Sequence, residues 1–153
     1  MDATIKNLYK EFSVYKRPEH FTDYKHCDEC EEHDNTMRSA TLKTLSSEHL
    51  GCVGWAPFSF LTEEGFAYYM PKIIELAANG ELNIHGEPFV IQVILQLLPT
   101  NNHDRFARYS TSQCKAVYEA LCLTSAVQHE AINNYCYDSD MEKALEYWKN
   151  RST

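Results

Sequence analysis

The chain has 153 residues, of which 44% are hydrophobic, and a formal net charge of −8 at pH 7. This length is typical of one domain with a sizeable buried core, so we expect residues 1–153 to form a single domain that folds without disulfides. The negative charge argues against a nucleic acid or an anionic membrane as partner, because both are bound through basic side chains. It is compatible with a basic protein partner, although keeping the protein soluble is the more ordinary role of such a charge.

The first part of the chain has one amphipathic segment followed by a polar one. Apolar side chains recur at helical spacing in residues 2–15, and Pro18 predicts the end of that helix shortly before it. Residues 19–45 are polar and charged, and they contain a cluster of cysteines and histidines. We expect a second helix to begin near this cluster and to continue through Leu45.

Aromatic residues and helix-start signals follow in the middle of the chain. A short turn is predicted to end at Gly51, and the aromatic segment 53–61 is expected to be a loop. Thr62 followed by two glutamates predicts a helix N-terminus. Pro71 has no N–H and crowds the preceding turn, so this helix is expected to kink or restart there. Gly80 predicts its end.

The last third contains an apolar segment and two capping boxes. Residues 89–98 have an apolar helical pattern, and the boxes at 110–113 and 139–142 predict the starts of two further helices. Alternation with period two, the signature of a strand, does not persist anywhere. The sequence therefore predicts an all-α fold of about six or seven helices, with a loop-rich thiol and imidazole cluster after the first helix.

The lack of a recognisable secretory signal or membrane span, together with the cysteine spacing, predicts a cytoplasmic protein. The N-terminus lacks a basic region followed by an apolar one, so we expect no secretory signal. The apolar segment 89–98 contains two glutamines and is too short to span a membrane. The six cysteines are irregularly spaced, so we expect reduced thiols rather than a disulfide framework.

Four short motifs resemble the pattern of a family of uncharacterised bacterial proteins. They are RP at 17–18, HCDECEEH at 26–33, WAP at 55–57 and FAYYMP at 66–71. The family pattern is Arg-Pro, then HC-x-x-C-x-x-H, W-x-P and F-x-Y-Y-x-P. The resemblance covers roughly residues 17–125. It implies a small intracellular all-α protein from bacteria, and it implies no particular activity.

The segment HCDECEEHD, residues 26–34, is where the sequence offers chemistry. Cysteines with C-x-x-C spacing are typical of a zinc knuckle, because two sulfurs three residues apart can bind one ion. A second C-x-x-C, usual in structural zinc sites, is missing. The predicted zinc ligands are Cys27, Cys30, His33 and His26, with His20, Asp34 or a residue distant in sequence as alternatives for the fourth position.

A zinc site in this segment requires a break in the helix near Cys27. On one straight helix, the ligands at 26–33 would spread over about 10 Å of axial rise, too far for four bonds of about 2.0–2.3 Å to one ion. The first ligand must therefore lie on a loop and the later ones on the first turn of a helix. We expect such a centre to tie the first helix to the second.

Two other interpretations of the same segment stay open. Cys27 and Cys30 at a helix start are also the pattern of a redox pair, with His33 as a proton shuttle. The neighbouring acids are expected to raise a thiol pKa, which does not suit a reactive thiolate. Alternatively, the two cysteines are small buried residues and the histidines and acids are solvated.

The remaining conspicuous residues are predicted to be structural. The aromatic side chains of residues 55–69 are expected to form a corner of the core, with a ligand groove as the alternative. His103, Arg105 and Arg108 are expected to lie in a solvated loop, with anion binding at the following helix start as the alternative. The other four cysteines are expected in the core: Cys52, Cys114, Cys122 and Cys136.

Common catalytic motifs are missing from the sequence. It contains no G-x-S-x-G, P-loop, H-E-x-x-H or G-x-G-x-x-G. We therefore expect a non-catalytic protein-binding module with a structural zinc site, of the immunity or inhibitor kind, whose partner is a basic protein. The alternative is a thiol oxidoreductase that uses the Cys27–Cys30 pair.

Overall fold

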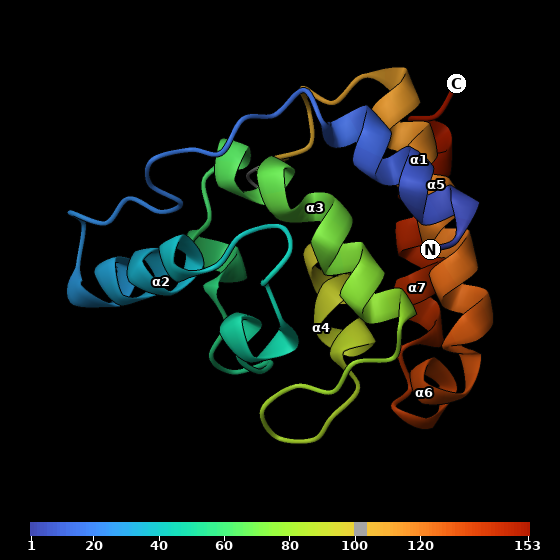
Figure 1. The fold of residues 1–153 in the computed structure, drawn as a ribbon. Coiled ribbons are helices and arrows are strands. Elements are labelled where there is room, and N and C mark those ends of the chain that lie inside the picture. Colours follow the sequence, from blue (N-terminus) through green and yellow to red (C-terminus); the bar gives the residue numbers. More distant parts are fainter. Residues whose placement is uncertain (100–103) are drawn as a thin grey trace.

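Seven α-helices and two short 3-10 helices form in the residues that the structure describes, 1–99 and 104–153 of this computed structural model (Figure 1). The α-helices are α1 (Ala3–Phe12), α2 (Asp28–Ser39), α3 (Glu63–Ala78), α4 (Phe89–Gln96), α5 (Thr111–Val127), α6 (His129–Asn134) and α7 (Asp138–Asn150), and the 3-10 helices are η1 (Ser47–Leu50) and η2 (Pro57–Phe60). β pairing in these residues is limited to three isolated bridges. The prediction of an all-α fold is confirmed.

The central helix is α3, which packs against α1, α4 and α5 (Figure 1). Neighbours cover it on several sides, and three of its large side chains, Phe66, Tyr69 and Met70, are fully buried. α7 packs on α5, and the ring N–H of its buried Trp148 donates a hydrogen bond to the carbonyl of Leu97 at 2.8 Å. The buried apolar side chains of these helices form one contiguous core.

α2 lies at one side of the molecule, over η2 (Figure 1). Its C-terminal end is held by the hydroxyl of Tyr69, which lies 2.9 Å from the carbonyl of Met37 and 2.7 Å from that of Ala40. The guanidinium of Arg17 donates to the carbonyl of Arg38 at 2.8 Å. These contacts fix α2 against the core and leave its N-terminal end, with the C-x-x-C segment, at the edge of the molecule.

Several predicted helix ends are confirmed. Gly51 follows η1, and the side chain of Thr62 caps α3 by accepting a hydrogen bond from the N–H of Gly65 at 3.0 Å. Gly80, with a φ of 75°, follows the last turn of α3. The predicted capping box at Ser110 begins α5.

Other predicted boundaries are wrong. α3 does not restart at Pro71 but continues through it, because burial of the residues around the proline outweighs the loss of about 3 kcal/mol that a proline brings to a helix interior. α2 ends at Ser39, well before Leu45. α6 has no counterpart in the predicted elements. α7 begins at Asp138, so Ser139 lies inside its first turn instead of capping it.

The apolar segment predicted at 89–98 forms α4, which ends at Gln96. Phe89, Val93 and Ile94 are buried in the core. None of the helices in the described residues is both long and apolar enough to cross a membrane.

Candidate metal centre

α2 begins at the C-x-x-C segment, with Cys27 as its N-cap residue. The backbone of Cys27 is extended, with φ −162° and ψ 170°, and the N–H of Cys30 donates to the Cys27 sulfur at 3.4 Å. Just before it, the N–H of His26 donates to the carbonyl of Asp23 at 3.0 Å and closes a tight turn. The helix break that a zinc site requires is therefore present, with His26 on the turn and Cys30 in the helix.

This break brings three of the predicted ligands together. The ligand atoms of His26, Cys27 and Cys30 all lie within 4.8 Å of one another. The two sulfurs are 3.2 Å apart, and His26 Nδ1 is 3.6 Å from Cys30 Sγ. Tetrahedral zinc, with bonds of about 2.3 Å to sulfur and 2.0 Å to nitrogen, places two sulfurs about 3.8 Å apart and a sulfur and a nitrogen about 3.5 Å apart. The observed arrangement is close to this geometry.

The centre is open to solvent, and its two thiols differ. Cys30 is 6% exposed, whereas Cys27 is an exposed residue. The backbone N–H of Cys30, followed by hydrogen bonds with the Cys30 thiol and the His26 ring, lowers the pKa of Cys27 to about 7. The pKa of Cys30 is raised, chiefly by its hydrogen bond to Cys27. The expectation that nearby acids raise the thiol pKa is therefore wrong for Cys27, where donors at the helix N-terminus dominate.

The structure does not bring His33 into this group. The residue is 3% exposed, and its ring packs against Trp55 and Phe60, with centroid distances of 5.0 and 4.8 Å. Among the residues that the structure describes, its Nε2 atom has no hydrogen-bond partner, and the nearby carboxylate of Glu29, at 3.8 Å, is too distant for one. His33 therefore contributes to the contact between α2 and the segment around η2.

Two residues considered for the fourth position are engaged with each other. Asp34 is 1% exposed, and its carboxylate lies 2.7 Å from His20 Nδ1. It also accepts hydrogen bonds from the N–H groups of Phe21, at 2.6 Å, and Thr22, at 3.2 Å. Asp34 and His20 thus hold residues 20–22 onto α2 rather than facing the thiols.

Asp23 is a neighbour of the site that the sequence analysis missed, and it lies outside the group of three ligand atoms. The pKa values of His26 and Cys30 are raised chiefly by Cys27 and more weakly by the negative charge of Asp23. The turn closed by the hydrogen bond from the His26 N–H to the Asp23 carbonyl brings these two residues together. Its sequence, DYKH, contains no glycine or proline, so no strong turn signal marks it.

A metal ion at this centre would join the turn 23–26 to α2. It would not reach α1, which ends at Phe12, so the expected tie between the first and second helices is wrong. That connection is made instead by Arg17, which follows α1 and contacts Arg38 at the end of α2 and the Tyr69 hydroxyl of α3.

The predicted solvated loop before α5 is wrong for Arg105. Its guanidinium lies 4.0 Å from the ring centroid of Phe66 and donates to the carbonyl of Phe58 at 2.6 Å. Burial lowers the pKa of Arg105 to about 10. Arg108 is exposed, as predicted. His103 lies outside the described residues.

The aromatic segment and the other cysteines are partly as predicted. Phe58, Phe66 and Tyr69 are buried at the predicted corner of the core, whereas Trp55 is 46% exposed. Of the four remaining cysteines, two are buried and two are exposed, so the prediction of a core position is wrong for half of them. The buried ones are Cys52 and Cys114, and the exposed ones are Cys122 and Cys136.

Fold and site together define a helical domain with a histidine and two cysteines within metal-binding reach at the start of α2. A sequence-family model described as a family of unknown function (DUF6714) matches residues 6–152, and the chain belongs to that family. The match includes α7 and most of α1, so it extends beyond the range 17–125 of the predicted resemblance. No curated protein and no solved structure matches the chain.

Proposed function

We propose that this protein is a non-catalytic binding module that holds one zinc ion through His26, Cys27 and Cys30. The observation that supports the metal is the convergence of three ligand atoms within 4.8 Å. Thiolate and imidazole ligands favour zinc over magnesium or calcium, which prefer oxygen. The neighbouring acids of α2 are compatible with a zinc–thiolate centre, because a zinc ion bound by two thiolates and a neutral imidazole carries no net charge that would repel or attract them strongly.

The zinc would stabilise the start of α2 and the turn before it. Three ligands come from this segment, and Asp23 or a water molecule would fill the fourth position. Because the ligands span so short a piece of chain, closing the loop between them contributes little. The stabilisation would come from preferential binding of the metal to the folded form.

The partner in this proposal is a basic protein. The net charge of −8 would attract such a partner and speed its association, and it would repel nucleic acids and anionic membranes. Immunity and inhibitor proteins that neutralise a basic partner attract it in the same way, through their negative charge.

Elemental analysis of untagged protein, purified without added metal, tests the zinc. About one zinc per chain is expected, and a chelator should release it and unmask two thiols. Cys27→Ser and Cys30→Ser should each abolish stable zinc binding, whereas Cys122→Ser, at an exposed cysteine of α5, should leave it unchanged. Failure of the reduced protein to take up added zinc, or full zinc content in the Cys27→Ser/Cys30→Ser variant, would rule the site out.

Alanine variants of His26 and His33 test which histidine is a zinc ligand. His26→Ala should weaken zinc binding by tenfold or more, on the order of the effect of losing one ligand or its support. His33→Ala should keep the zinc and lower the melting temperature, because it removes a buried ring that packs against Trp55 and Phe60. Loss of zinc in His33→Ala with retention in His26→Ala would reverse the assignment.

A thiol oxidoreductase is the second candidate, supported by the 3.2 Å separation of the two sulfurs. Small side-chain rotations would bring them to the S–S bond length of about 2.05 Å. In metal-free protein, the alkylation rate of Cys27 should rise as the pH is raised through about 7, because the thiolate reacts, and should level off above it. A normal thiol pKa, or no Cys27–Cys30 disulfide in glutathione redox buffers, would exclude this function.

A further inference from the structure

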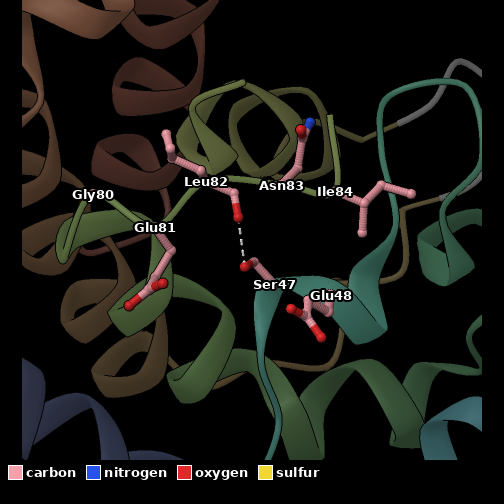
Figure 2. A pocket seen from close by; sticks show the side chains of 7 residues that line it. All are labelled: Ser47, Glu48, Gly80, Glu81, Leu82, Asn83 and Ile84. Atoms are coloured by element: carbon pink, nitrogen blue, oxygen red, sulfur yellow. Dashed lines mark hydrogen bonds between the residues drawn. The ribbon is translucent and has the colours of Figure 1, made fainter. Parts of the chain in front are cut away.

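An open hollow lies between η1 and the turn that follows α3 (Figure 2). Its volume is about 600 Å³, and it is lined by Ser47 and Glu48 from η1 and by residues 80–84. The hydroxyl of Ser47 donates to the carbonyl of Leu82 at 2.7 Å and joins the two sides (Figure 2). The hollow is well separated in sequence from the thiols, which lie at the start of α2.

The segment on one side of the hollow is a rigid turn. The N–H of Phe89 donates to the carbonyl of Glu81 at 2.9 Å, and the N–H of Asn83 donates to the carbonyl of Glu87 at 2.8 Å. The buried amide of Asn83 donates to Gln92 at 2.9 Å. These bonds order the backbone of the turn with the Asn83 side chain buried, while its two neighbours in sequence are exposed.

Two large aliphatic side chains are therefore held at the surface. Leu82 is 55% exposed and Ile84 is 53% exposed. A single exposed aliphatic residue is ordinary, but here two of them line one hollow on a backbone held by hydrogen bonds. Burying them against a partner would remove apolar surface from water at little conformational cost, because the turn is already ordered.

The hollow also carries negative charge that this part of the chain does not neutralise. Glu48 lines it from η1 and Glu81 from the opposite turn (Figure 2). In residues 44–99 the sequence has a single Lys or Arg, Lys72, whose ammonium pairs with Glu75 at 3.4 Å. Among the described residues, neither Glu48 nor Glu81 forms an ion pair, so a cation from outside meets two available carboxylates.

We propose that this hollow binds an extended, basic segment of the partner protein, with an aliphatic side chain against Leu82 and Ile84 and a lysine or arginine between Glu48 and Glu81. The proposal rests on the protein-binding part of the proposed function and supplies its contact surface. The two carboxylates favour a segment with basic side chains, because the charges are complementary. The two exposed aliphatic side chains of the hollow favour a segment in which apolar residues alternate with the basic ones.

Fluorescence anisotropy with a labelled peptide of alternating lysine and leucine tests the surface on the full chain. The peptide should bind, and versions with glutamate for lysine or serine for leucine should bind about tenfold more weakly or worse. Raising the salt concentration should weaken binding of the original peptide, because its charges are solvent-exposed. Equal binding of all three peptides would overturn the proposal.

Paired variants separate this surface from general charge attraction. Glu48→Gln/Glu81→Gln and Leu82→Ser/Ile84→Ser should each weaken peptide binding about tenfold. Glu142→Gln/Glu146→Gln, on the exposed face of α7, makes the same change in net charge and should have less than about a twofold effect. Thermal melts confirm that each variant is folded. Equal weakening by the α7 variant, or no effect of Leu82→Ser/Ile84→Ser, would overturn the proposal.

Measurements on zinc-loaded and chelated protein keep the two proposals apart. The hollow shares no residue with the metal centre, so peptide affinity should be the same in both states. If the protein binds the peptide but takes up no zinc, the zinc proposal is contradicted and the docking surface is supported. If the protein takes up zinc but does not bind the peptide, the zinc proposal is supported and the docking surface is contradicted.

Discussion

At the level of single residues, Asp34 shows how one side chain positions a loop. The preceding residues 20–22 have no helical pattern, yet they lie fixed against α2 because the Asp34 carboxylate accepts from two of their N–H groups and contacts His20. Thr22 adds a bond of 2.6 Å from its hydroxyl to the carbonyl of Cys30. The turn that carries His26 is thereby anchored just upstream of the candidate metal centre.

Replacing Asp34 with alanine should lower the free energy of unfolding by about 2–4 kcal/mol, because two N–H groups would stay buried without an acceptor. Asp34→Asn keeps one acceptor oxygen and should lose less. Glu32→Ala, at an exposed position of the same helix, should change stability by less than about 0.5 kcal/mol. Urea denaturation of metal-free protein measures all three. A loss in Asp34→Ala no greater than in Glu32→Ala would contradict this role.

At the level of elements, two similar sequence signals have different outcomes. The box at Ser110 caps α5, with the Ser110 hydroxyl accepting from the N–H of Gln113 at 3.1 Å and the Gln113 side chain accepting from the N–H of Ser110 at 2.9 Å. The box at Ser139 does not form, because α6 ends in a turn that already directs the chain into α7. In that turn the N–H of Tyr137 donates to the carbonyl of Ile132, and Cys136 has a φ of 62°.

Alanine substitutions distinguish the two signals. Ser110→Ala should lower the free energy of unfolding by about 1 kcal/mol, the usual effect of losing an N-cap side chain. Ser139→Ala should be neutral within about 0.5 kcal/mol, since alanine suits the first turn of a helix and no cap is lost. Thermal unfolding at matched concentration measures both. A larger effect at Ser139 than at Ser110 would show that α7 begins as the sequence pattern predicts.

At the level of the whole molecule, Arg105 links segments that are far apart in sequence. It donates to the carbonyls of Phe58, in η2, and Gln96, at the end of α4, while its guanidinium stacks over Phe66 of α3. Three elements thus depend on one cation. The burial of this guanidinium is tolerated because carbonyl oxygens and an aromatic face replace water around it.

Arg105→Lys should destabilise the protein by about 2–3 kcal/mol, because an ammonium cannot reproduce the planar set of donors or the stacking. Arg108→Lys is the matched control, and it should have almost no effect because Arg108 is exposed. Guanidinium-induced unfolding provides the comparison. Equal stability of the two variants would show that the contacts of Arg105 are not needed for the packing of α3, α4 and η2.

Local chemistry explains which predictions succeeded. Thr62, Ser110 and Gly80 act within one helical turn, and each marks a helix end as predicted. The break at Cys27 agrees with the prediction that a metal site in this segment would require one, because ligands on one straight helix would lie too far apart for one ion. The failed predictions depend on contacts between distant residues. The helix continues through Pro71 because the core packs around it. After α6 the left-handed backbone conformation is adopted by Cys136, and a cysteine does not signal a helix end in the sequence as Gly80 does.

The sequence by itself determined the all-α fold, most helix starts and the C-x-x-C segment with its histidine, because helical periodicity and capping need only residues within a few positions of one another. The tertiary structure decided which histidine accompanies the thiols. The sequence predicted both His33 and His26 as ligands, but α2 packs His33 against Trp55 and Phe60, whereas the turn at Asp23 holds His26 beside the sulfurs. Such choices depend on which face of a helix is buried, and that is fixed by contacts across the whole fold.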